Sequence, residues 1–105
     1  MGWRSTKPVQ TEAEIERKFV SLVKARGALC YKFVSPGNPG VPDRILILPD
    51  GRVMFVEMKS AVGRTKKLQD YQLEKLSRQG VPTFVLRGAE DVKKFIEDIF
   101  GKEVR

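Results

Sequence analysis

The feature that most constrains the fold is a short turn flanked by two apolar runs. The runs span residues 45–48 and 53–56, and Pro49-Asp50-Gly51 lies between them. Proline suits the second position of a type I turn and aspartate the third, and glycine suits the next position, where the chain takes a positive φ. This pattern predicts a β-hairpin with a three-residue loop.

The length of that loop determines which residues face each other across the hairpin. A three-residue loop pairs Leu48 with Arg52, and each further pair lies one residue farther out on both strands. Continued to the strand ends, this register sets Asp43 opposite Glu57. Because side chains alternate between the two faces of a strand, Asp43, Glu57 and Lys59 share one face. Both faces are otherwise largely apolar, which predicts that these strands are central in a sheet and covered on both sides.

Apolar periodicity and turn signals predict the remaining elements of one domain. Thr11 and Glu14 form a capping box at the start of a helix, and Gly27 ends it. A helix that connects the third strand to the fourth requires a parallel pair, so we expect an α/β fold with a central mixed sheet and the order α-β-β-β-α-β-α. We expect a loose leader at residues 1–10 and the folded domain at 11–105. The expected helices span 11–26, 67–78 and 90–100, and the expected strands span 28–34, 45–48, 53–56 and 82–87.

The residue types that are absent narrow the chemistry. The chain has no histidine and a single cysteine, Cys30. Ser-His and Cys-His catalysis, the usual zinc sites and an intrachain disulfide are therefore excluded. Twenty Lys and Arg residues against thirteen Asp and Glu residues give a net charge of +7, which favours an anionic partner such as nucleic acid. Cysteine usage and the lack of a long apolar segment predict a cytoplasmic protein without a membrane partner, in a bacterial cell or a virus-infected host cell.

The predicted pairing of Asp43 with Glu57 is chemically informative. Like charges directly opposite each other in a sheet are destabilising, and a divalent cation such as Mg²⁺ relieves that repulsion. Such an ion lowers the pKa of a bound water and neutralises charge on a phosphate, and Lys59 on the same face could orient the water or stabilise negative charge. The alternative is that Glu57 and Lys59 lie on a solvated rim and that Asp43 caps the preceding proline-rich loop.

Two sequence blocks on either side of the hairpin carry a family resemblance. Residues 40–45 are GVPDRI, and residues 55–59 are FVEMK. Their Pro-Asp pair and Glu-Met-Lys triplet resemble the motif of the PD-(D/E)XK nuclease superfamily, and the predicted element order is similar to its restriction-endonuclease-like core. Together with Gln69, the two blocks resemble the VRR-NUC domain family more closely, and the resemblance extends over nearly the whole chain.

This resemblance implies a Mg²⁺- or Mn²⁺-dependent phosphodiesterase related to Holliday-junction resolvases. It implies that Asp43, Glu57 and the carbonyl of Met58 bind the metal and that Lys59 assists the water. Gln69 would hydrogen-bond a catalytic carboxylate or a phosphate, and an exposed helical glutamine is the alternative. Small stand-alone members of the family suggest a homodimer, because cutting a junction symmetrically needs two sites.

The superfamily usually adds an acidic residue from the first helix. Glu12 falls within the angular range of the apolar stripe on this helix, Glu16 falls at its edge, and Glu14 lies opposite. The VRR-NUC pattern favours Glu12, whereas resolvase-like spacing favours Glu16. Stabilisation of the helix dipole is the alternative explanation for both residues.

Basic residues supply the expected contacts to DNA. Three of them follow Lys59 closely, where a backbone phosphate would approach, although a solvated charge run is the alternative. The candidate contacts are Arg64, Lys66, Lys67, Arg44 and Lys32. The leading hypothesis is a metal-dependent endonuclease that hydrolyses phosphodiester bonds in branched DNA such as Holliday junctions. The alternatives are a non-catalytic basic module that binds DNA or RNA, and a nuclease that acts on duplex or flap DNA.

Overall fold

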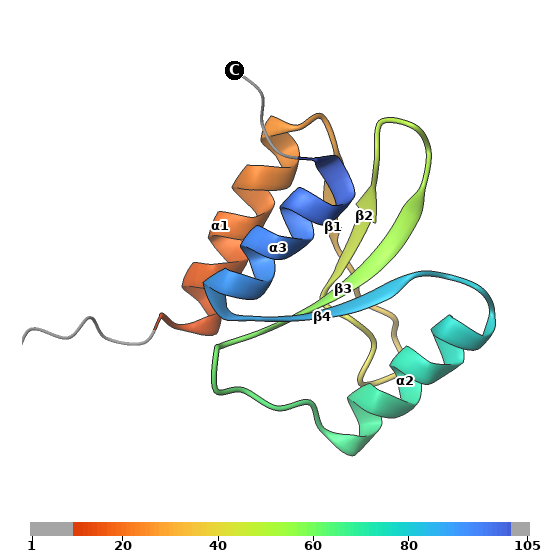
Figure 1. Cartoon of the computed structure of the whole chain (residues 1–105). Coiled ribbons are helices and arrows are strands. Elements are labelled where there is room, and N and C mark those ends of the chain that lie inside the picture. Colours follow the sequence, from red (N-terminus) through yellow and green to blue (C-terminus); the bar gives the residue numbers. More distant parts are fainter. Residues whose placement is uncertain (1–9, 102–105) are drawn as a thin grey trace, which may run out of the picture.

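The computed structural model describes residues 10–101. Within this range the elements follow the order α-β-β-β-α-β-α (Figure 1), which confirms the predicted α/β fold. Residues 1–9 of the expected leader lie outside the described residues. The helices are α1 (Glu12–Ala25), α2 (Lys67–Arg78) and α3 (Gly88–Phe100), and the strands are β1 (Leu29–Lys32), β2 (Arg44–Ile47), β3 (Val53–Lys59) and β4 (Thr83–Arg87).

The strands form one sheet in the order β1-β2-β3-β4. β1 and β3 both pair antiparallel with β2, and β4 pairs parallel with β3, so the hairpin strands are central as predicted. The hairpin register is also the predicted one, because Ile45 faces Phe55 and Ile47 faces Val53. The Leu48 N–H donates to the Arg52 carbonyl at 2.8 Å, and Gly51 has the positive φ of +92° that the turn requires.

One face of the sheet carries the hydrophobic core. α1 and α3 lie side by side over this face (Figure 1) and contact each other. The expected capping box starts α1, since the Glu14 N–H donates to the Thr11 hydroxyl and the Thr11 N–H donates to the Glu14 carboxylate. Burying the apolar stripe of each helix against the sheet provides most of the driving force for folding. The core includes Ile15, Phe19, Val23, Leu46, Val56, Met58, Val92, Phe95 and Ile96.

The opposite face is covered only in part, which corrects the expectation of cover on both sides. α2 lies on this side and contacts β4 (Figure 1), and no helix within residues 10–101 lies over the half formed by β1 and the hairpin. Leu29, Tyr31 and Val53 are consequently 49%, 54% and 39% exposed. The physical reason is that α2 is the connection between β3 and β4, which keeps it at that end of the sheet.

Three elements have a boundary that differs from the prediction by two residues or more. β1 is confined to its pairing with β2 and is shorter than the expected 28–34. β3 extends to Lys59 because pairing with β4 continues past the end of the hairpin. α3 begins at Gly88, earlier than expected, and the Asp91 carboxylate accepts a hydrogen bond from the Arg87 N–H at its start. No helix among residues 10–101 is long and apolar enough to cross a membrane.

Candidate active site

Asp43 is held at the start of β2 by its backbone and by its side chain. Its carbonyl accepts a hydrogen bond from the Phe33 N–H at 2.8 Å, and its Oδ2 accepts one from the Met58 N–H at 3.0 Å. One further step along the hairpin register sets Asp43 opposite Glu57. The half-buried carboxylate therefore lies against the end of β3.

The loop before Asp43 is packed against the start of α2. Gly40 has a φ of +90°, and a Cβ added there would lie 2.8 Å from the Leu68 carbonyl oxygen, so only glycine fits. Gln72 is buried on α2 and donates to the carbonyl of Pro39 at 3.2 Å. These two contacts hold the loop that leads to Asp43 against α2.

Glu57 is the deepest ionisable residue of the site, with only 1% of its surface exposed. Its Oε2 accepts a hydrogen bond from the Gln69 amide at 2.8 Å and lies 3.4 Å from the Lys59 Nζ. Its Oε1 is buried and has no hydrogen-bond partner among the described residues. An unpartnered buried carboxylate oxygen is costly in an ordinary core, and this atom is therefore a candidate ligand for a bound cation.

The electrostatic setting of Glu57 is unusual for a carboxylate. The pKa of Glu57 is raised from 4.5 to about 7, chiefly by burial and next by the negative charge of Asp43. Lys59 opposes this rise, and the charge of Glu12 adds to it. The site therefore contains more negative charge than its own lysine compensates, which is the condition that favours a bound cation.

Gln69 links the second helix to the candidate catalytic carboxylate. Its amide nitrogen donates to Glu57, and its carbonyl oxygen accepts from the Lys66 N–H at 2.9 Å. Both halves of the amide are engaged, so Gln69 holds Glu57 in one orientation at the start of α2. The alternative of an exposed helical glutamine does not describe this arrangement.

The structure separates the glutamates of the first helix. Glu16 forms an ion pair with Arg44 Nε at 2.7 Å, and Glu14 is committed to the capping box. Glu12 is exposed at the first residue of α1, and its charge acts on Glu57. Glu12 is therefore the helix-one carboxylate that remains available to the site.

The site offers few side-chain ligands to a divalent cation. Among residues 10–101, no group of three or more His, Cys, Asp or Glu side chains is close enough to hold a metal ion by itself. Two carboxylates, a backbone carbonyl and waters are nevertheless the mixed oxygen set that Mg²⁺ accepts, and the unpartnered Oε1 of Glu57 offers an open position. The residues fit a hydrated hard cation and not an all-protein cage.

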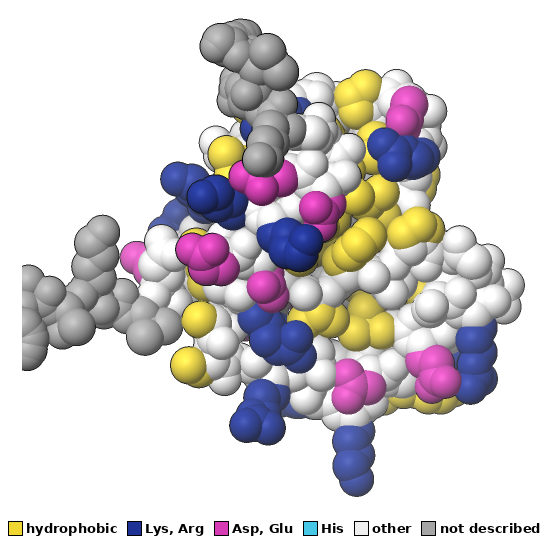
Figure 2. All heavy atoms as spheres, in the orientation of Figure 1, with side chains coloured by type: hydrophobic (Ala, Val, Ile, Leu, Met, Phe, Trp, Pro, Cys, Tyr) yellow, Lys and Arg dark blue, Asp and Glu magenta, His cyan; other side chains and the backbone are white. Residues whose placement is uncertain are grey.

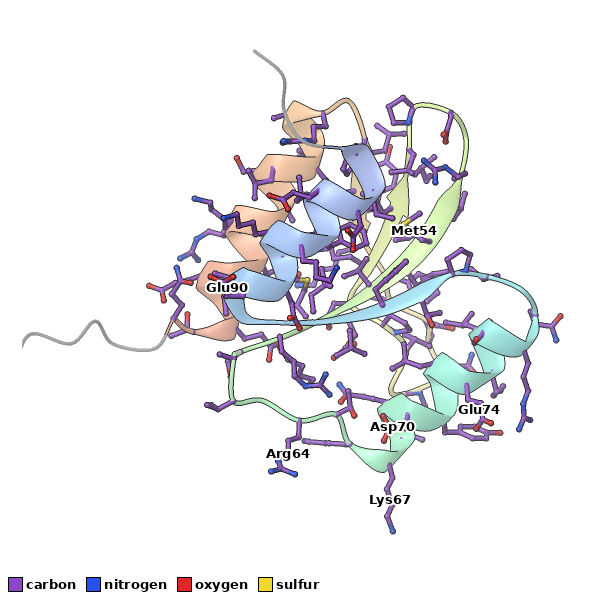
Figure 3. All side chains as sticks on the ribbon, in the orientation of Figure 1. Met54, Arg64, Lys67, Asp70, Glu74 and Glu90 are labelled. Atoms are coloured by element: carbon purple, nitrogen blue, oxygen red, sulfur yellow. The ribbon has the colours of Figure 1, made fainter. Side chains whose placement is uncertain are left out.

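The expected DNA contacts fall into two groups. Arg64, Lys66 and Lys67 are exposed on the loop after β3 and at the start of α2. Figure 3 shows Arg64 and Lys67 extending away from the ribbon, and Figure 2 shows Lys and Arg side chains projecting from this end of the molecule.

Arg44 and Lys32 lie elsewhere. They pair with each other on β2 and β1, on the face opposite to Glu57, and the guanidinium of Arg44 is held by Glu16. The structure brings neither residue to the loop after Lys59, so both stand apart from the other expected contacts.

Sequence reasoning missed Gln72 and Arg87. Gln72 carried no signal, because a glutamine in a charged helix is ordinary. Arg87 ends β4 opposite Lys59, and finding it would have required the register of a parallel pair joined by a helix.

The fold and the clustered Asp43, Glu57 and Lys59 define an α/β domain of the VRR-NUC type. A solved structure described as a VRR_NUC domain superposes with a TM-score of 0.78 at 27% identity, over 86% of this chain and 99% of the other. A second, a VRR_NUC domain protein, shares the fold with a TM-score of 0.68 at 18% identity, over 86% and 88% of the two chains.

The family assignment follows from the sequence matches. The VRR-NUC domain family matches residues 8–90, so the chain belongs to this family. It is also 46% identical over 67 residues to "Putative nuclease p44" of Acyrthosiphon pisum secondary endosymbiont phage 1, a match that covers 64% of this chain and 69% of the phage protein.

Proposed function

We propose that this protein is a Mg²⁺- or Mn²⁺-dependent endonuclease that hydrolyses phosphodiester bonds in DNA. Membership of the VRR-NUC family supports nuclease chemistry. The observation that carries the proposal is Glu57, a fully buried carboxylate beside Asp43 and Lys59 with one unpartnered oxygen and a pKa near 7. If Glu57 had no role beyond the fold, its burial would lower the free energy of unfolding without any compensating gain.

The roles of the residues follow from their contacts. Asp43, Glu57 and the carbonyl of Met58 would hold the cation, with Glu12 as the contribution of α1. When bound, the ion would supply a Lewis acid that lowers the pKa of water and neutralises phosphate charge. Lys59 lies on the same face as Glu57 and would orient the attacking water. Gln69 keeps Glu57 in place through its hydrogen bond.

The substrate class we propose is branched DNA such as Holliday junctions, cut by a homodimer. The basic loop and the start of α2 support binding through phosphates and not through base edges.

The half of the sheet without a covering helix exposes Leu29, Tyr31 and Val53, and this surface supports association of two copies. Light scattering on the purified protein tests the dimer, and a strict monomer would contradict symmetric cutting.

The proposed activity is tested with labelled junction, flap and duplex DNA in the presence of Mg²⁺ or Mn²⁺. We expect the wild type to cut the junction, and we expect Asp43→Asn or Lys59→Ala to lower the rate by about 10²–10⁴-fold. Asp50→Asn and Lys75→Ala serve as matched controls, because both residues are exposed and lie away from Glu57. Cleavage that survives both site substitutions contradicts the proposal.

The same panel separates the alternative functions. A non-catalytic module would bind DNA without cutting it, with an affinity indifferent to the metal. A nuclease for other substrates would lose activity in the Asp43→Asn and Lys59→Ala variants but would prefer duplex or flap DNA over the junction.

A further inference from the structure

Arg87 occupies a position beside the candidate catalytic lysine. It is the last residue of β4 and pairs with Lys59 in the parallel register of β3 and β4. Neighbouring strands lie about 4.8 Å apart and paired side chains leave the same face. The Arg87 side chain therefore begins on the face that carries Glu57 and Lys59, one strand farther toward the sheet edge.

Lys59 and Arg87 differ in what they can reach. Lys59 is only 9% exposed, and its Nζ is engaged with the Glu57 carboxylate. Arg87 is exposed to solvent. A DNA backbone that approaches the site thus meets Arg87 at the surface, whereas Lys59 serves the buried carboxylate.

The guanidinium of Arg87 is held in a defined position. Its Nε donates to the Gly63 carbonyl at 3.2 Å, and its backbone N–H donates to Asp91 at 2.8 Å. The loop that contains Gly63 packs closely against the start of α3, where a Cβ added at Gly88 would lie 2.9 Å from the Ala61 Cβ. The two Nη atoms make no hydrogen bond or ion pair with the residues of the described range. An arginine bonded through Nε still offers these nitrogens to a phosphate.

We propose that Arg87, with Arg64 next to Gly63 on the adjoining loop, forms a phosphate-binding site that holds the DNA backbone beside the bond to be cut. This inference rests on the proposed nuclease function. The position of Arg87 at the end of β4 would set where the DNA strand enters the site. The hydrogen bond to Gly63 would keep the loop and the arginine at a constant spacing.

The test measures DNA binding as a function of salt with the full chain. Fluorescence anisotropy of labelled junction DNA, without divalent metal, gives Kd at a series of salt concentrations. We expect Arg87→Ala to raise Kd by about 10–150-fold, the effect of losing one charged hydrogen bond, and to reduce the slope of log Kd against log salt by about 0.9. Arg87→Lys should restore the slope and recover only part of the affinity, because lysine keeps the charge but lacks the planar pair of donors that binds a phosphate through two hydrogen bonds.

Arg78→Ala is the matched control. Arg78 is an exposed arginine at the end of α2 that pairs with Glu74 at 2.7 Å, and its removal should leave Kd and slope unchanged. A loosened loop alone would change the affinity without reducing the number of phosphate contacts, so the slope distinguishes the two roles.

The outcomes separate this inference from the proposed function. A wild type that cuts DNA, with an Arg87→Ala variant of unchanged Kd and slope, overturns the phosphate site and leaves the nuclease in place. A wild type that binds DNA through Arg87 but does not cut supports the phosphate site and contradicts the nuclease. A wild type that neither binds nor cuts DNA overturns both.

Discussion

The two faces of the sheet make opposite use of the same strand. On β3, Val56 and Met58 are fully buried beneath α1 and α3, and they contribute hydrophobic burial to the stability of the fold. Between and beyond them, Glu57 and Lys59 are buried on the other face, where removal of charge from water costs stability. The helix-covered face therefore supplies the stability that offsets the cost of burying the Glu57 carboxylate, whose pKa is raised to about 7, on the other face.

The largest expected change in the free energy of unfolding comes from a substitution on the helix-covered face. Phe19 is fully buried, with its ring 5.7 Å from that of Phe95. Phe19→Ala should lower the free energy of unfolding by about 3–5 kcal/mol, because it removes apolar contacts and leaves a cavity. Urea denaturation measures the change, with the exposed Ser21→Ala on the same helix as the control. A loss below about 1 kcal/mol would show that this face is not the main source of stability.

A substitution on the other face is expected to change the free energy of unfolding less, and in the opposite direction. Glu57→Gln removes a buried charge that its surroundings disfavour, so it should raise the free energy of unfolding by about 1–2 kcal/mol at pH 8 without metal. The same substitution should abolish cleavage. The exposed Glu74→Gln is the control: it loses one surface ion pair with Arg78, so it should change the free energy of unfolding by less than about 0.5 kcal/mol and leave cleavage intact. A destabilised Glu57→Gln protein would mean that the carboxylate contributes to the fold and would remove the contrast between the two faces.

The smallest expected effect is the pH dependence that Glu57 produces. Its pKa is raised from 4.5 to about 7, so between these values the folded protein keeps a proton that the unfolded chain releases. The stability contributed by this proton is fully present below pH 4.5 and is lost as pH rises through 7. We expect a fall of about 1 kcal/mol between pH 6 and pH 8 in the metal-free wild type relative to Glu57→Gln. Denaturation at both pH values measures it, and parallel behaviour of the two proteins would contradict the raised pKa.

Local chemistry accounts for what could be predicted from the sequence. The register of the hairpin followed from Pro49-Asp50-Gly51, and the start of α1 followed from the capping box of Thr11 and Glu14. The same register predicts that Asp43 and Glu57 lie near each other. These features depend on residues that are close in the chain, where turn geometry and helical period leave few alternatives.

The contacts between distant segments could not be predicted. Glu12 and Glu16 were both compatible with the helix period, and only the ion pair of Glu16 with Arg44 separated them. The cover of the sheet was overestimated, because apolar residues on both faces do not indicate how far a single helix extends.

The sequence alone thus determined the order of the elements, the hairpin register and the residue types available for catalysis, because these depend on local backbone preferences and composition. The tertiary structure decided how deeply Glu57 is buried, that Gln69 holds it, and that Arg87 lies beside Lys59. The physical reason is that these properties arise from the packing of α2 and β4 against β3, and the free energy of that packing belongs to no single segment of the chain.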